Sequence, residues 1–135
     1  MKAFSVKTPK IGATRYTDII KRARHIYHDI EKQTKRRPYI RSSYFKKEKV
    51  FFDFYWVHLS QASFVDRRRR LKFLPCAIEL IEKSRYEPIS QPNPRKRGEI
   101  LHRFAGTTPD QEIFYVQIKE DLKTKQKFLM SIFPG

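Results

Sequence analysis

Three short runs in the last third of the chain constrain its fold most. They alternate apolar and polar residues, and two segments rich in turn-forming or charged residues separate them, Gly106 to Gln111 and Glu120 to Lys125. A period of two is typical of β-strands, and short turns join strands in antiparallel order. The chain is therefore expected to end in a β-meander with strands at Glu99 to Ala105, Glu112 to Lys119 and Lys127 to Phe133.

The two sides of this sheet are expected to differ in polarity, because side chains alternate across a strand. In the middle strand one side carries Phe114, Val116 and Ile118 and the other carries Tyr115, Gln117 and Lys119. In the last strand, strict alternation separates Phe128, Met130 and Ile132 from Lys127, Leu129, Ser131 and Phe133. We expect helices to cover the apolar side and an open surface to present Tyr115, Gln117, Lys119 and Ser131. Whether His102 or Arg103 joins that surface stays open, since both alternating sets of the first strand contain apolar residues.

The earlier part of the chain favours helices. Thr17 can cap a basic amphipathic helix that closes near Arg36 to Pro38 and whose apolar side carries Ile20, Ala23, Ile26, Tyr27 and Ile30. A second helix is expected to start near Ser63, because Asp66 follows at the spacing of a capping box. Pro75 either kinks that helix or begins a new one. Helices followed by antiparallel strands indicate an α+β fold, with N-terminal helices packed on the C-terminal meander.

Two segments connect these parts. In Val50 to His58 we expect a strand over Val50 to Phe52, an N-cap at Asp53 and two helical turns that end near His58. Glu87 to Gly98 contains three prolines and a basic triplet, so it is expected to be a loop.

A chain of 135 residues is expected to form a single domain. Residues 1–16 show no periodicity and are interpreted as a basic arm, and residues 17–135 as one α+β domain. No apolar run reaches the length of a membrane span, and the single cysteine, Cys76, indicates a reducing compartment. The expected location is the cytoplasm.

The charge of the chain favours a polyanionic partner. Lys and Arg number 30 against 14 Asp and Glu, a formal net charge of +16. RNA is the expected partner, because such a surface binds phosphates and releases their counterions. A membrane is not expected, since the helix from Thr17 to Gln33 lacks a Trp or Phe face. The expected nucleic-acid contacts are Tyr115, Gln117, Arg67, Arg68, Arg69, Arg70, Arg95, Lys96, Arg97 and Lys127.

The residue types favour chemistry without a metal or another cofactor. One cysteine and four scattered histidines contain no spacing typical of a zinc site. Metal-free cleavage of RNA needs a base, an acid and cations that stabilise the charge developing at phosphorus. His58 or His102 is a candidate base or acid, and Arg103 and Lys119 are candidate cations. Ser131 is a candidate hydrogen-bond donor to a phosphate oxygen.

The order of these elements resembles the barnase/EndoU/colicin/RelE-type ribonuclease superfamily, particularly its phage and mobile-element branches. The resemblance covers about residues 49 to 134 and is carried by the helical His58, the segment from Leu74 to Ile81, ILHRF, FYVQIKED and Ser131-Ile132-Phe133. It implies RNA cleavage through a 2′,3′-cyclic phosphate, with Ser131 in the terminal motif and Lys119 or Arg103 as the basic residue. It also implies a toxin or phage effector, for which an acidic antitoxin or immunity protein is an expected partner.

Three hypotheses follow from the sequence. The first is a metal-independent endoribonuclease of the toxin or phage-effector type. The second is a nucleic-acid-binding protein of phage or plasmid origin without catalysis. The third is a protein that docks on another nucleoprotein through its aromatic residues and basic loops.

Overall fold

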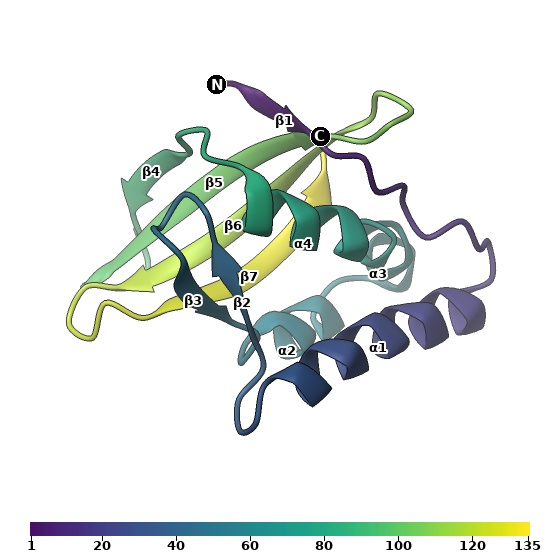
Figure 1. The fold of residues 1–135 in the computed structure, drawn as a ribbon, viewed down its shortest axis with the longest axis horizontal. Coiled ribbons are helices and arrows are strands. Elements are labelled where there is room, and N and C mark those ends of the chain that lie inside the picture. The colour runs from purple at the N-terminus through teal and green to yellow at the C-terminus, as the bar shows by residue number, and fades with distance from the viewer.

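The computed structural model describes all residues from 1 to 135 and contains one curled, mixed sheet with helices on one side and along one edge (Figure 1). The helices are α1 (Tyr16–Gln33), α2 (Tyr55–Ser60), α3 (Phe64–Leu71) and α4 (Leu74–Lys83). The strands are β1 (Ala3–Ser5), β2 (Tyr39–Ser42), β3 (Glu48–Phe51), β4 (Ile89–Pro92), β5 (Glu99–Thr107), β6 (Ile113–Asp121) and β7 (Lys127–Pro134). The spatial order is β1-β5-β6-β7-β3-β2, and β4 also pairs with β5. The α+β fold is confirmed.

The C-terminal meander forms as expected. β5 pairs antiparallel with β6, and β6 pairs antiparallel with β7. Phe114, Val116 and Ile118 are buried on the side that faces the hydrophobic core, and Tyr115 and Gln117 lie half-buried on the reverse side. We call the reverse side of β5, β6 and β7 the open face.

A register shift in β7 corrects the expected faces of that strand. Gln117 lies opposite Ser131, but the next residue, Ile118, lies opposite Leu129, so Met130 is the extra residue of a β-bulge. A bulge reverses the facing of all residues beyond it. Leu129 is therefore buried in the core with Ile118, and Phe128 lies opposite Lys119 on the open face.

The first 16 residues do not form a free arm. β1 pairs parallel with the end of β5, and Val6 and Ile11 are buried in the core. Glu79 of α4 accepts hydrogen bonds from the backbone N–H groups of Lys7 and Thr8, both at 2.9 Å. The segment has no periodicity because isolated apolar residues and a distant carboxylate hold it in place.

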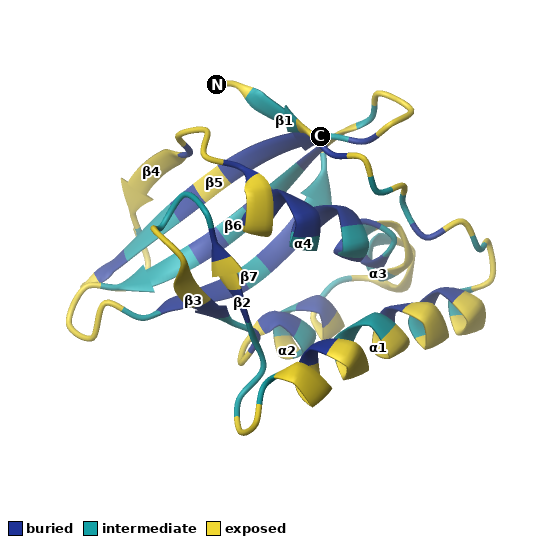
Figure 2. Cartoon of the chain, in the orientation of Figure 1, coloured by how far each residue is buried: buried dark blue, intermediate teal, exposed yellow.

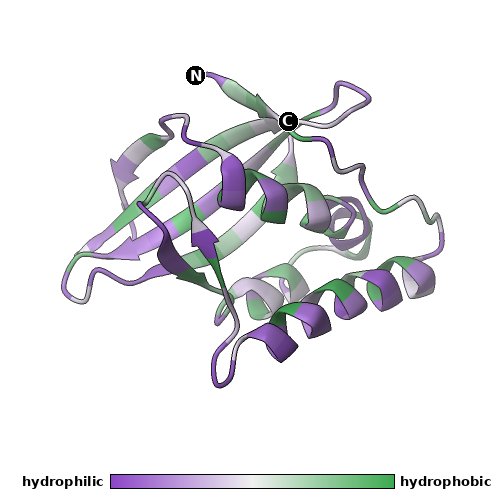
Figure 3. Ribbon diagram, in the orientation of Figure 1, coloured by the Kyte–Doolittle hydropathy of each residue, from purple (hydrophilic) through white to green (hydrophobic).

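Helix α1 has the amphipathic pattern that its sequence predicts, although it begins at Tyr16 and has no side-chain cap. Ile19, Ala23 and Ile30 are buried, and the opposite side is exposed and charged (Figures 2 and 3). None of the four helices is both long and apolar enough to cross a lipid bilayer.

The segment between β3 and α4 differs from expectation at one cap. Ser63 caps α3 by accepting a hydrogen bond from the N–H of Asp66 at 3.2 Å, as its spacing predicts. Pro75 lies in the first turn of a separate helix, α4. Asp53 caps no helix, because its carboxylate instead binds the guanidinium of Arg37, with Nη2 at 2.7 Å. Phe54 is the residue before α2.

β3 contains Val50 and Phe51 of the expected strand, and it forms a hairpin with β2 and pairs parallel with the start of β7. A further short strand lies in a segment interpreted as a loop. β4 is an exposed strand within the proline-rich segment and pairs antiparallel with β5. The last residue of β4 is Pro92, and prolines are tolerated in edge strands.

Candidate functional site

The open face brings side chains from three strands together. Gln117 in β6 has Arg103 of β5 on one side and Ser131 of β7 on the other. Tyr115, two residues earlier in β6, lies opposite Phe133. Cross-strand neighbours on one face lie within contact distance of each other. The choice between His102 and Arg103 is thereby settled, since Arg103 is the residue of β5 that lies on the open face.

Two arginines and two aromatic rings form the centre of this face. The Cζ of Arg103 lies 5.4 Å from the ring centroid of Phe133 and 6.0 Å from that of Tyr115. The Cζ of Arg70, from α3, lies 6.0 Å from the Phe133 centroid. The rings of Tyr115 and Phe133 are 5.5 Å apart and tilted by 35°. Guanidinium groups beside partly exposed aromatic rings suit phosphates and unstacked bases.

A small pocket lies beside this cluster at the outer edge of β7. His58 of α2, Arg70 of α3 and Ser131 of β7 all line it, with Tyr55 and Leu59 among its apolar walls. Ser131 is 8% exposed, whereas His58 is half-buried and also lines an adjoining, wider hollow with Gln61 and Asp66. The pocket has a volume of only about 10 Å³, so it encloses no ligand; it marks the place where an imidazole, a guanidinium and a hydroxyl group come together at one edge of the open face.

The fold of α2 and α3 explains how His58 and Arg70 reach the sheet. Tyr55 and Leu59 are buried, so they attach α2 to the core, and His58 lies between them in the helix. The Ser63 cap fixes the start of α3, and the buried Leu71 fixes its end. Arg70, next to Leu71, is therefore held at the edge of β7. Both α2 and α3 contact β7.

The other arginines of α3 are placed differently. Arg68 and Arg69 are exposed, and Arg69 lies 3.9 Å from Asp66. The Nε atom of Arg67 is buried and has no hydrogen-bond partner. Of the four expected contacts in this run, Arg70 alone lines the pocket with His58 and Ser131.

Lys119 lies on the open face but its ammonium group is already partnered. Its side chain is 12% exposed, and its Nζ lies 3.3 Å from Glu99 Oε2 and 4.0 Å from the ring centroid of Phe54. Burial opposes the ionisation of Glu99, but hydrogen bonds from Asn93 and Lys119 outweigh it, so the pKa of Glu99 lies below its usual range. Lys119 therefore serves first as a structural ion-pair partner.

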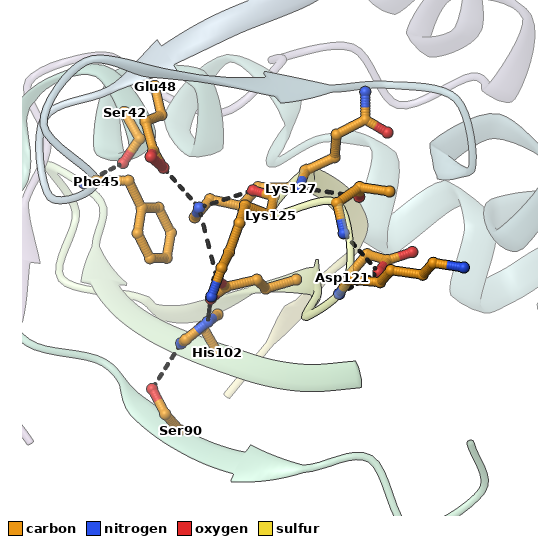
Figure 4. A network of polar contacts seen from close by, with 12 residues as sticks. Ser42, Phe45, Glu48, Ser90, His102, Asp121, Lys125 and Lys127 are labelled. Atoms are coloured by element: carbon orange, nitrogen blue, oxygen red, sulfur yellow. Dashed lines mark hydrogen bonds and ion pairs between the residues drawn. The ribbon is translucent and has the colours of Figure 1, made fainter. Parts of the chain in front are cut away.

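His102 and Lys127 lie on the opposite side of the sheet from the open face. His102 pairs in register with Ile118 and is 7% exposed. Its two ring nitrogens contact Ser90 Oγ at 2.6 Å and Glu120 Oε1 at 2.9 Å (Figure 4). Lys127 is 4% exposed and lies 2.5 Å from Glu48 Oε2. These contacts remove both residues from the expected RNA-binding surface. For Lys127 the cause is the bulge at Met130, which turns the side chain of Lys127 to the opposite side of the sheet from Ser131.

The basic triplet lies in the turn between β4 and β5. Arg95, Lys96 and Arg97 are all exposed, and Lys96 lies 3.4 Å from Glu99. Because Glu99 also binds Lys119, this turn is tied to the open face through one carboxylate. The triplet is therefore an exposed cationic edge of the same surface.

Phe133 is the residue of this site that the sequence interpretation did not select. Alternation already placed it on the same side as Ser131, and an aromatic residue on the polar side of that strand was the available signal. No group of three or more His, Cys, Asp or Glu residues is arranged to hold a metal ion.

No protein-family model, no curated protein and no solved structure matches the chain.

Proposed function

We propose that this protein is a metal-independent endoribonuclease that binds single-stranded RNA on the open face. The observation that carries the proposal is the common pocket of His58, Arg70 and Ser131 at the edge of a surface that combines arginines with aromatic rings. The family resemblance to the barnase/EndoU/colicin/RelE-type superfamily belongs to the same proposal.

Binding would rest on charge and stacking. Arg70 and Arg103 neutralise phosphates, and the net charge of +16 attracts RNA from a distance. Tyr115 and Phe133 offer ring surfaces to unstacked bases, which a duplex does not present. Gln117, between Arg103 and Ser131, supplies a donor and an acceptor to a base or ribose.

Cleavage would use the 2′-hydroxyl of the bound RNA as the nucleophile. The neutral imidazole of His58 accepts the 2′-hydroxyl proton as the 2′-oxygen bonds to phosphorus. The bond from phosphorus to the 5′-oxygen breaks, and that oxygen takes a proton from solvent. The products are a 2′,3′-cyclic phosphate and a free 5′-hydroxyl. Arg70 stabilises the charge that develops on the phosphate oxygens, and Ser131 donates a hydrogen bond to one of them.

An acidic inhibitor protein fits this proposal as a partner. The open face and the exposed triplet Arg95 to Arg97 are cationic, so a carboxylate-rich surface would compete with RNA for them.

A non-catalytic RNA-binding protein is the second candidate. It is favoured by the position of His102 on the other side of the sheet, which leaves His58 as the histidine at the proposed pocket. A single imidazole lowers the activation barrier for RNA cleavage less than a matched acid and base do.

One experiment separates the two candidates. The purified protein is incubated with a 5′-labelled single-stranded RNA in excess EDTA, and the products are resolved together with a binding assay on the same sample. Fragments that end in a 2′,3′-cyclic phosphate support the endoribonuclease. A stable complex with intact RNA supports the binding protein. If the protein neither binds nor cleaves the RNA, both candidates are rejected.

A further inference from the structure

We infer that Ser90, His102 and Glu120 form a second, separate site, in which Ser90 is a nucleophile toward small carboxylic esters. The three side chains form one hydrogen-bonded chain across β4, β5 and β6, with Ser90 Oγ 2.6 Å from His102 Nδ1 and His102 Nε2 2.9 Å from Glu120 Oε1. This inference does not depend on the proposed ribonuclease activity.

The direction of the hydrogen bonds is that of an activated serine. Glu120 as a carboxylate can only accept, so in the neutral form of His102 the ring carries its proton on Nε2 and Nδ1 is the acceptor. Ser90 therefore donates its hydroxyl proton to His102. A nucleophile, a base and a group that orients the base are the three parts of a catalytic serine triad, and such a triad is recognised by geometry rather than by sequence order.

The exposure of the three residues matches these roles. Ser90 is exposed on β4, an edge strand, so an ester can approach its Oγ. His102 is 7% exposed, and the Glu120 side chain is 15% exposed. The ring of Phe45 packs edge-on against the imidazole, with centroids 5.0 Å apart, and shields it from water (Figure 4).

A second layer of charges fixes the carboxylate that orients His102. Lys127 Nζ lies 3.7 Å from Glu120 Oε2 and 2.5 Å from Glu48 Oε2, and it donates to the backbone carbonyl of Lys125 at 3.0 Å. Lys127 is thus a positioning residue. Its contacts hold Glu120 in place from the side away from His102.

The edge position of β4 leaves some of its backbone N–H groups unpaired, and a group of this kind is the donor that a developing oxyanion would need. β4 pairs with β5 on one side, and alternate N–H groups of an edge strand point away from the sheet.

In the first step a bond forms between Ser90 Oγ and the acyl carbon, and the Oγ proton moves to His102 Nδ1. The ester C–O bond then breaks, and the alcohol leaves with that proton. Water then attacks the acyl carbon and gives a proton to His102 Nδ1. The bond between Ser90 Oγ and the acyl carbon breaks, Oγ takes that proton back, and the acid is released.

The experiment uses a fluorophosphonate label and p-nitrophenyl acetate with the full chain. The label is expected on Ser90 by peptide mass spectrometry, and the rate of labelling should fall at least tenfold in His102→Gln. Ser90→Ala should abolish it and, because Ser90 is exposed, should remain folded by circular dichroism. Ser43→Ala is the matched control, since Ser43 donates to the backbone carbonyl of Glu82 and contacts no histidine.

Each result decides the inference. Labelling of Ser90 that needs His102, with matching loss of ester hydrolysis, supports it. Failure of the wild-type protein to label at Ser90 overturns it, as does equal labelling in a folded His102→Gln variant. Ser90→Ala should lose ester hydrolysis and keep RNA binding, so this site and the RNA proposal stand or fall separately.

Discussion

The guanidinium carbon of Arg103 lies 5.4 Å from the ring centroid of Phe133, two strands away across β6. This contact joins the first and last strands of the meander on the open face. It places the exposed arginine beside an aromatic ring. A phosphate that binds Arg103 is therefore held next to a ring on which a base can stack.

Replacement of Arg103 by alanine should weaken RNA binding and reduce its salt dependence. Loss of one phosphate contact lowers the log–log salt slope by about 0.7 for a single strand, which is about fivefold in affinity at 0.1 M salt. Arg103→Lys should keep the slope but lose part of the affinity, because lysine keeps the charge without the planar stack. Fluorescence anisotropy at several salt concentrations measures both quantities. Arg36→Ala, an exposed arginine outside the open face, is the control, and an equal effect there would contradict a specific role for Arg103.

Replacement of His58 by alanine should slow cleavage strongly without loss of binding. General acid–base catalysis contributes roughly 10²- to 10⁴-fold, so the single-turnover rate should fall by that factor while the Kd for RNA changes less than twofold. Quenched-flow assays in EDTA measure the rate. His25→Gln on α1, where the imidazole is exposed, serves as the control and should cleave normally. Unchanged cleavage by the alanine variant would remove His58 from the mechanism.

Protonation of Glu79 should loosen the N-terminal segment at acid pH. Burial opposes its ionisation, but hydrogen bonds from Thr8 and Lys7 outweigh it, so the pKa of Glu79 lies below the ordinary value of 4.5. The unfolded chain then binds more protons than the folded one in this range. The contribution of Glu79 to stability is complete above pH 4.5 and is lost as the pH falls through the folded-state pKa.

Chemical denaturation from pH 7 to pH 3 tests this effect. Glu79→Gln should be less stable than the wild type at pH 7 by about 1–3 kcal/mol, because its donors lose a charged partner. The difference should shrink as the pH falls. Glu87→Gln, an exposed residue, should show neither effect, and a constant difference across the pH range would argue against the Glu79 linkage.

Addition of a methyl group at Gly106 should destabilise the fold. A Cβ there would lie 2.6 Å from Phe114 Cζ of β6 and 2.7 Å from Leu80 Cδ1 of α4, and both side chains are buried. Overpacking of this kind costs about 1–3 kcal/mol in the free energy of unfolding. Urea denaturation of Gly106→Ala measures it. Gly12→Ala is the control, because an added Cβ there has no atom within 4 Å, and it should leave stability nearly unchanged. An equal loss of stability in both variants would show that the contacts with Phe114 and Leu80 are not the cause.

The sequence was sufficient for the features that repeat locally. Alternation in β6 placed Tyr115, Gln117 and Lys119 on one face, and the spacing of Ser63 and Asp66 located the start of α3. Both patterns involve residues that lie close together in the chain, so they can be recognised without tertiary contacts.

Features that depend on distant partners were not predictable. Nothing in the composition of β7 marks Met130 as an extra residue, and the bulge alone decides that Lys127 and Ser131 lie on different sides. His102 and Arg103 were equivalent by pattern, and pairing with Ile118 and Gln117 separates them. The attachment of Thr8 to Glu79 joins residues 71 positions apart, which no local rule detects.

The parallel pairing of Ala3 with Ala105 sets the order in which the molecule can assemble. The first strand of the chain has no partner until the fifth strand has been synthesised and folded, so during translation it waits for a late segment. Contacts of such long sequence separation close slowly, because the intervening chain must be ordered first. The amino-terminal strand is therefore expected to be the last part to dock and the first to detach under mechanical or thermal load.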